Sequence, residues 1–166
     1  MTVTEIEQRA FRDACGRFAT GVTAVTGIGP DGALAALTVN SFTSVSLDPM
    51  RVLFCIGERS SAYGILAAAE RVAVHVLADD QEEVARRLAT AGLSGAERLA
   101  DLDWAPGRCG EPLLAGAAAR FAGPVVQRVD SGDHGIFVVG VDDVELGVPR
   151  DSAMIFLSGR FHTFNR

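Results

Sequence analysis

Residues 38–49 (TVNSFTSVSLDP) form the longest stretch of the sequence whose side chains could hold a small polar ligand. Alternation along a predicted strand puts Thr38, Asn40 and Phe42 on one face and the intervening residues on the other. Polar groups on a buried strand are costly unless they are hydrogen-bonded. The stretch is therefore either an edge strand with solvated hydroxyls or a wall of donors and acceptors for a planar heterocycle.

A second candidate is Arg59-Ser60-Ser61, directly before a predicted helix. Two hydroxyls, the free backbone N–H groups of a helix start and an arginine together suit a phosphate group. The alternative is an ordinary N-cap serine beside an arginine that points into solvent.

A third candidate is the tetrapeptide at residues 132–135 (GDHG), where His134 enters a strongly apolar strand. The flanking glycines allow a ligand to approach the backbone closely. The alternative is a turn histidine in solvent.

Several kinds of chemistry are excluded or disfavoured by residue type. All 15 basic residues are arginine, so a Schiff-base lysine, a Walker A lysine and a Ser-x-x-Lys motif are absent. Cys15, Cys55 and Cys109 lie far apart, and the three histidines form no close pair, so we expect no metal site. We expect the thiols to be free and mostly buried, as in a reducing cytoplasm.

Length and charge narrow the class further. The 166 residues suit one domain spanning 1–166. A net charge of -6 disfavours nucleic acid as a partner but allows one basic pocket for a small anion. The N-terminus is charged and amphipathic, and no apolar run reaches the roughly 20 residues of a membrane helix, so we expect a cytoplasmic protein without membrane contact.

The elements that position these segments are mainly strands. Residues 4–20 read as a helix, with Thr4 and Glu7 as a capping box and Ile6, Ala10 and Ala14 on one face. Further helices are predicted at 62–70 and from residues 79–83 (DDQEE), whose acidic side chains open the helix, with one helical turn near 96–100 within the loop 92–110. The predicted strands cover residues 22–26, 33–42, 51–56, 71–77, 113–121, 125–129, 136–145 and 153–164.

This order does not alternate strand and helix, which argues against a parallel doubly wound sheet. It predicts a mainly β (α+β) fold, a small antiparallel barrel with a few outer helices. Residues 136–141 are apolar on both faces, which fits a barrel wall covered by a helix or by a partner subunit.

Residues 27–32 (GIGPDG) match the dinucleotide fingerprint G-x-G-x-x-G. The segment that follows is predicted to be a strand, so no helix N-terminus is available for a pyrophosphate. Pro30, Asp31 and Gly32 are residue types that favour turns, and the segment is predicted to be a hairpin turn.

The order of the motifs resembles one family from Phe11 to Phe164. The matching pieces are Phe11-Arg12, residues 18–22 (FATGV), 38–49 (TVNSFTSVSLDP), 52–56 (VLFCI), 76–77 with Gln81, 110–113 (GEPL), 132–134 (GDH) and 158–161 (SGRF). The chain thus resembles the short-chain flavin reductases, FMN-binding split-barrel proteins that supply reduced flavin to two-component monooxygenases.

The resemblance implies a homodimer of six- to seven-stranded split barrels with FMN or FAD at the interface, and NADH or NADPH as hydride donor. It places the residues as follows: Thr38, Val39, Asn40, Ser41 and Ser44 along the isoalloxazine, Cys55 near it, Ser60 and Ser61 at the flavin phosphate with help from Arg87, and His134, Arg160 and Phe161 facing the nicotinamide. His134 is the candidate catalytic residue, in an orienting role.

Three positions depart from the family pattern. His75 stands where asparagine is frequent, Ala36 where glycine is frequent, and Leu88 where phenylalanine is common. They put in doubt a flavin contact at position 75, the backbone's approach to the ring, and the aim of Arg87.

The resemblance favours an NAD(P)H:flavin oxidoreductase that releases reduced flavin to a separate monooxygenase. Two alternatives share the fold: a protein that retains its flavin and passes electrons to a protein partner, and a non-catalytic flavin carrier. NADH consumption that depends on added flavin separates the first from the others, and a tightly held yellow cofactor favours the second.

Overall fold

The computed structural model describes residues 5–165, with side chains from residue 7 onward. The predicted capping residue Thr4 lies outside the described residues, and the side chain of Ile6 is not described. The helices are α1 (Glu5–Cys15), α2 (Tyr63–Ala68), α3 (Glu82–Ala89) and α4 (Gly95–Leu99). None of them is long and apolar enough to cross a bilayer.

Strands make up most of the remaining chain. They are β1 (Thr20–Gly21), β2 (Thr23–Ile28), β3 (Leu34–Val39), β4 (Thr43–Leu47), β5 (Met50–Gly57), β6 (Arg71–Val76), β7 (Trp104–Pro106), β8 (Pro112–Leu114), β9 (Ala119–Ser131), β10 (His134–Gly140), β11 (Asp143–Leu146), β12 (Ser152–Leu157) and β13 (Arg160–Asn165). The main sheet has the order β3-β2-β6-β9-β10-β5-β4, with β11 paired to β9, and its neighbours are antiparallel.

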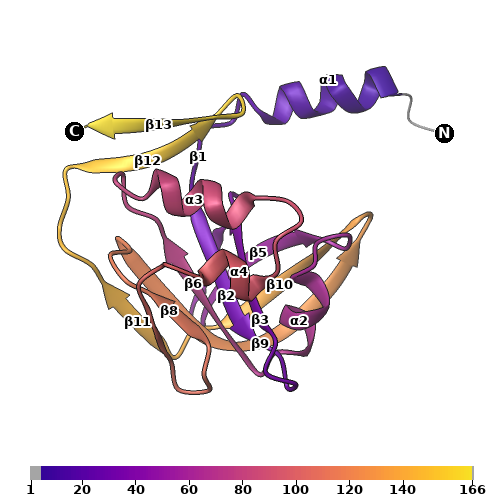
Figure 1. The fold of residues 1–166 in the computed structure, drawn as a ribbon. Coiled ribbons are helices and arrows are strands. Elements are labelled where there is room, and N and C mark those ends of the chain that lie inside the picture. Colours follow the sequence, from indigo (N-terminus) through magenta and orange to yellow (C-terminus); the bar gives the residue numbers. More distant parts are fainter. Residues whose placement is uncertain (1–4, 166) are drawn as a thin grey trace.

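This sheet curls around one apolar core, as Figure 1 shows, so the predicted antiparallel barrel with outer helices is confirmed. Strand β3 is at one end of the strand order and β5 is near the other end. Because the sheet curls, β3 nevertheless comes into contact with β5. Phe54 and Phe137 stack at 5.3 Å inside the barrel. A second apolar cluster, which includes Ala36, Leu88 and Leu99, lies between the sheet and the helices α3 and α4.

Strand β9 passes from one half of the sheet to the other without a break, so the predicted division at residues 122–124 is wrong. Its first half pairs with β6 and its second half with β10. A Cβ at Gly123 would lie 1.8 Å from the carbonyl oxygen of Gly140, so glycine here serves a close crossing rather than a turn. Pro124 is exposed.

The predicted strand 136–145 is divided after Gly140 into β10 and β11. Asp142, between the two strands, takes part in a cluster of ion pairs. Arg71, on β6 and almost fully buried, binds Asp142 through two nitrogens and Glu111 at 2.8 Å. Glu111 belongs to the GEPL motif and also accepts the backbone N–H of Cys109 at 2.8 Å. The motif therefore supplies the buried partner of a buried cation.

Residues 27–32 end β2 and lead into the hairpin turn to β3, which lies at residues 29–33, so the predicted hairpin is present. The Gly29 N–H donates to Ala33 O, the Ala33 N–H donates to the Asp31 carboxylate, and Gly32 has φ +83°. Strand follows the turn directly, so the dinucleotide interpretation is excluded.

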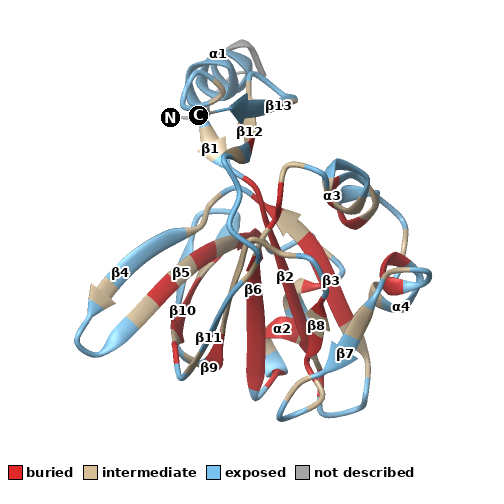
Figure 2. Cartoon of the chain, turned by 90° about the vertical axis from the view of Figure 1, so that its left-hand side faces the viewer, coloured by how far each residue is buried: buried red, intermediate tan, exposed pale blue. Residues whose placement is uncertain are grey.

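Helix α1, β1 and the β12–β13 hairpin form an arm that projects from the barrel (Figures 1 and 2). Every described side chain of α1 from residue 7 to 15 is exposed. Three phenylalanines of the arm and the adjoining linker are also exposed: Phe11 by 70%, Phe18 by 76% and Phe164 by 60%. A helix of this length is marginal alone in water, and α1 gains no stability from burial of these side chains within its own chain.

His75 is buried in the wall of the barrel, away from the open edge of the sheet. Its Nδ1 lies 3.3 Å from Ala24 O, and its Nε2 accepts the Leu114 N–H at 3.1 Å. Burial lowers the pKa of His75 from its usual 6.5 to about 4. This position joins β6 to β2 and β8 and serves the fold.

Protonation of His75 should therefore destabilise the fold in mild acid. The unfolded chain binds this proton below about pH 6.5 and the folded chain only near pH 4. Stability is complete above the higher value and falls by up to about 3 kcal/mol as the pH drops to the lower one. Chemical denaturation at a series of pH values measures this slope.

The variant His75→Gln keeps an acceptor for Leu114 and removes the titration. We expect it to flatten the stability profile between these two pH values, whereas His162→Gln, at an exposed position, leaves the profile unchanged. An unchanged slope in His75→Gln contradicts the assignment.

Candidate functional site

The outer edge of β3 has no neighbouring strand, and side chains and helices contact it instead. Arg98 Nη1 donates to Ala36 O at 2.8 Å, and Thr38 Oγ1 donates to Ala85 O at 2.6 Å. Helix α4 lies so close that a Cβ at Gly95 would be 1.8 Å from Leu34 O. The Thr38 hydroxyl thus ties β3 to α3, and its hydrogen is not available to a ligand.

The end of β3 is joined to β5 by one hydroxyl. Ser41 Oγ accepts the Cys55 N–H at 2.8 Å and donates to Cys55 O at 3.2 Å, so it replaces a strand partner. Burial raises the pKa of the Cys55 thiol, which is therefore neutral near pH 7. Cys55 is suited to contact a ligand and not to attack one.

The predicted strand 33–42 is too long. Strand β3 stops at Val39, because Ser41 turns to β5 and Phe42 folds back to stack on Phe121 at 5.5 Å. The predicted alternation from Thr38 to Phe42 therefore fails. Val39 points into the core and offers a ligand its backbone only.

Asn40 and Ser41 line a cavity of about 520 Å³ between the barrel and the linker that leads to the arm. Phe18 and Thr20 form part of its other wall. Ser44 lies on β4 next to a bulge and is exposed. The structure thus brings Asn40, Ser41 and Cys55 together and leaves Ser44 to one side.

The loop after β5 carries the predicted phosphate residues. Helix α2 begins at Tyr63, one residue later than expected, and Ser60 Oγ accepts the Ala62 N–H at 3.3 Å. Ser61 is exposed and lines a cavity of about 240 Å³ that also includes Ala36 and Arg98. These two cavities lie at opposite ends of β3.

Arg87 does not line this cavity. Its Nε donates to Arg98 O at 2.9 Å and its Nη2 donates to Glu97 O at 2.8 Å, so it holds the end of α4. The buried guanidinium at the cavity is that of Arg98, which the sequence did not single out. Helical spacing could not reveal it, because α4 is too short to show a periodic face.

His134 begins β10 opposite Gly57, and Cys55 pairs with Ile136 next to it. These residues face the same side of the sheet. His134 Nδ1 lies 2.7 Å from Asp133 Oδ1, and this hydrogen bond lowers the pKa of Asp133. Asp133 therefore orients the His134 imidazole, which lies on the same face of the sheet as Cys55.

Arg160 and Phe161 lie on the arm, apart from His134 in the barrel (Figure 1). Arg160 is exposed, whereas Phe161 packs 5.3 Å from Phe156 with the Arg86 guanidinium 4.9 Å above its ring. One chain by itself does not bring these two residues to the candidate site.

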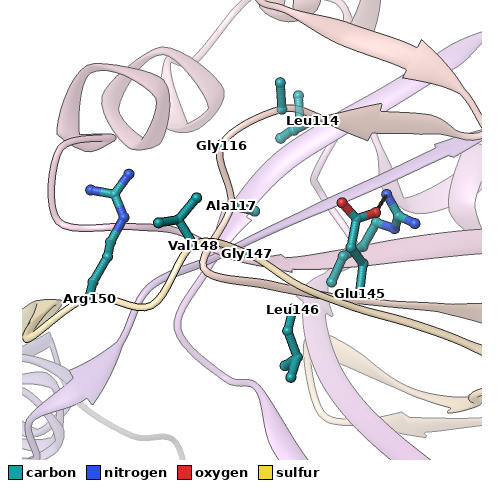
Figure 3. Close-up of a pocket in the computed structure, with 10 residues that line it drawn as sticks. Leu114, Gly116, Ala117, Glu145, Leu146, Gly147, Val148 and Arg150 are labelled. Carbon is teal, nitrogen blue, oxygen red and sulfur yellow. Dashed lines mark ion pairs between the residues drawn. The ribbon is translucent and has the colours of Figure 1, made fainter.

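A further cavity of about 290 Å³ lies between residues 114–117, which lead into β9, and residues 145–150 at and after the end of β11, and Figure 3 shows its lining. Its cations are neutralised within the chain, because Arg120 pairs with Glu145 at 2.7 Å and Arg150 with Asp79 at 3.0 Å. Leu146, at its rim, is 80% exposed. The charged side chains of this cavity are therefore paired within the chain and leave little net charge for a ligand.

The cysteines differ from expectation in one respect. They are free, but Cys15 and Cys109 are exposed and only Cys55 is partly buried. Within residues 5–165, no group of three His, Cys, Asp or Glu side chains is placed to hold a metal ion.

This geometry defines the fold class of the protein as a split barrel with an open strand edge. Residues 15–165 match the family model described as flavin reductase like domain. The FMN reductase (NADH) SmoA of Agrobacterium fabrum is 39% identical over 159 residues, which are 95% of this chain and 87% of that protein. The chain therefore belongs to the flavin reductase family.

Solved structures agree with this assignment. The Streptomyces globisporus NADH:FAD oxidoreductase SgcE6, in complex with NAD and FAD fragments, is 36% identical with a TM-score of 0.87, covering 99% of this chain and 96% of that one. BorF, the flavin reductase component of a bacterial two-component tryptophan halogenase, is 38% identical with a TM-score of 0.87, covering 96% and 99%.

Some relatives are much longer. The probable flavin reductase of Rhizobium meliloti is 40% identical over 83% of this chain, but the match spans only 43% of that protein.

The Ser41 bridge predicts a measurable loss on substitution. Ser41→Ala leaves both polar backbone groups of Cys55 without this partner, so we expect a loss of about 1–3 kcal/mol in the free energy of unfolding. Ser44→Ala, at an exposed hydroxyl three residues away, should change it by less than about 0.5 kcal/mol. Equal denaturation midpoints for the two variants contradict the bridging role.

Proposed function

We propose that the chain is an NADH- or NADPH-dependent flavin reductase that reduces FMN or FAD and supplies the reduced flavin to a separate monooxygenase. The observation that carries the proposal is the open strip between the end of β3 and β5, where Asn40, Ser41 and Cys55 meet beside His134. We infer that residues 1–166 form one flavin-reductase-like domain that acts in the cytoplasm.

The donor set of this strip fits a flavin. Cys55 supplies a neutral thiol, and Asn40 supplies an exposed amide at the mouth of the larger cavity. Val39 contributes backbone groups next to them. When bound, the flavin supplies the redox chemistry by accepting a hydride from the reduced nicotinamide.

The chain itself binds and orients. His134, held by Asp133 at 2.7 Å, offers an imidazole nitrogen beside Gly57, where a Cβ would lie 3.5 Å from Nε2. A hydride transfer between two rings needs alignment and needs no general base. His134 therefore serves to position the nicotinamide carboxamide and not to move a proton.

A second copy of the chain completes the proposal. The exposed face of α1 and the phenylalanines of the arm need cover that one chain lacks. The outer face of β9 and β10 is also apolar, with Val129 42% exposed beside Ile136. We infer a homodimer in which the arm, with Arg160 and Phe161, packs against the partner's barrel near the flavin.

The function is tested by steady-state oxidation of NADH and NADPH in the presence of FMN, FAD or riboflavin. We expect no turnover without added flavin and a rate that saturates with flavin concentration. A yellow protein that transfers electrons only to another protein indicates a flavin-retaining electron carrier. Flavin binding without NAD(P)H oxidation indicates a non-catalytic carrier. Either of these results contradicts the proposal.

His134→Ala should raise KM for the nicotinamide and lower kcat/KM about ten- to a hundredfold, the loss expected for one or two hydrogen bonds. Flavin affinity should stay near normal, because the imidazole faces the second ligand. Asp133→Asn keeps a hydrogen-bond partner for the imidazole and should show a smaller loss. A selective loss of flavin binding in His134→Ala would show that this residue contacts the flavin and not the nicotinamide, and would contradict the assignment.

The dimer predicts a defined mass in solution. Sedimentation velocity should show a dimer, and Phe11→Asp, which puts a charge on the apolar face of α1, should shift it toward monomer and reduce activity. A stable and fully active wild-type monomer contradicts this part of the proposal.

A further inference from the structure

Tyr63 lies across the β9–β10 hairpin on the face of the sheet opposite to His134. His134 and Gly135 are consecutive on β10, so their side-chain positions point to opposite faces. Tyr63, the first residue of α2, approaches the Gly135 face and packs edge-on against the ring of Phe137 at 5.6 Å. Its hydroxyl donates to Asp130 Oδ1 at 3.3 Å, and Asp130 is the β9 partner of Gly135. One side chain therefore connects the barrel core with the end of the hairpin.

Gly135 allows the Tyr63 ring to come this close. A Cβ at residue 135 would lie 2.7 Å from the Tyr63 hydroxyl oxygen and 2.8 Å from Cε2. Gly135 does not have the left-handed backbone that favours glycine at Gly132, where φ is +66°. Space for the tyrosine, and not backbone conformation, therefore requires glycine at this position. The hydroxyl lies directly against the backbone of the residue that follows His134.

The Tyr63 hydroxyl is suited to hold a carboxylate. Burial raises the pKa of Tyr63, and the charge of Asp130 and the hydrogen bond to it raise it further. Glu58 also raises this pKa, and Arg128 lowers it. The hydroxyl therefore stays protonated near pH 7 and donates to an ionised acceptor, which makes a stronger hydrogen bond than a neutral one does. Tyr63 is thus fixed from both ends, by the Phe137 ring and by Asp130.

The end of the hairpin carries the imidazole but is itself exposed. Residues 131–134 are all exposed, so they gain little from burial. The ladder between β10 and β5 ends at the pair His134–Gly57, and beyond it the Glu58 N–H donates to Asp133 O at 3.0 Å. The Asp133 carboxylate then pairs with His134 Nδ1 at 2.7 Å. The direction of the imidazole therefore depends on where the end of the hairpin lies, and Tyr63 holds this end from the opposite face.

We propose that Tyr63 is a positioning residue for His134. Through its hydrogen bond to Asp130 and its contact with the backbone of Gly135, it fixes the end of the hairpin and so the direction in which the imidazole meets the nicotinamide. This inference rests on the proposed flavin reductase function. It adds a residue that touches neither the flavin nor the nicotinamide and acts through the thickness of the sheet.

The kinetic test removes the hydrogen bond and keeps the ring. Tyr63→Phe should raise KM for NADH about three- to tenfold, the loss expected for one hydrogen bond, with kcat and the FMN dissociation constant within about twofold of wild type. Asp130→Ala should give the same rise, and the double variant no more than either single one. Asp130→Asn keeps an acceptor and should stay near wild type. Asp103→Ala removes an exposed carboxylate elsewhere and should leave KM unchanged.

The decisive variant carries Tyr63→Phe together with His134→Ala. If Tyr63 acts through the imidazole, the double variant has the KM of His134→Ala alone. A further rise in KM shows that Tyr63 acts by another route, and an equal loss of FMN affinity shows a general effect on the site. Either result, or an unchanged KM in Tyr63→Phe, overturns the inference.

Nuclear magnetic resonance tests the positioning without any turnover. The chain has three histidines, and His134→Ala identifies the ring signals of residue 134. Tyr63→Phe should shift or broaden these signals and leave those of His75 and His162 in place. Unchanged His134 signals overturn the inference. A wild type that does not oxidise NADH or NADPH with added flavin refutes the proposed function instead, and the spectra still decide whether Tyr63 orients the imidazole.

Discussion

Strand β3 ends the sheet with an edge that no further strand covers, and the rest of the candidate site depends on how this edge is satisfied. An exposed edge invites pairing with another chain. Here Arg98 and Gly95 bring α4 flush against the first half of the strand, and the Thr38 hydroxyl ties the second half to α3. Ser41 then takes the place of a strand partner on Cys55.

These contacts explain why the polar stretch 38–49 is tolerated in a barrel of apolar strands. Each hydroxyl that turns inward has a backbone partner, so its burial is not penalised. The groups that remain free, such as the Asn40 amide and the Ser61 hydroxyl, face the two cavities at the ends of β3. The same arrangement that closes the fold therefore leaves donors in a row between β3 and β5.

The sequence was sufficient for features set by local chemistry. The turn at Pro30-Asp31-Gly32 and the acidic start of α3 depend on neighbouring residues, and both were predicted. The long strand β9 was not, because Gly123 serves a close crossing with Gly140 that exists only in the folded sheet. The end of β3 at Val39 was missed for a related reason: it depends on Ser41 reaching Cys55, 14 residues away.

The site shows the same division. Ser41, Cys55 and His134 were found through motifs, and the fold brings them to one strip. Arg98 was missed because its burial results from the docking of a five-residue helix, which leaves no periodic signal in the sequence. Arg160 and Phe161 lie on an arm that one chain cannot place, so their role depends on a second copy.

The central claim is that a flavin lies along the strip between β3 and β5, with its ring at Ser41 and Cys55 and its phosphate at Ser60 and Ser61. A crystal structure of the protein grown with FMN tests this most directly. The account predicts electron density for the ring beside Cys55 and for the phosphate in the cavity lined by Ser61. Flavin density in any other place, such as the cavity lined by Leu114 and Arg150, would contradict it.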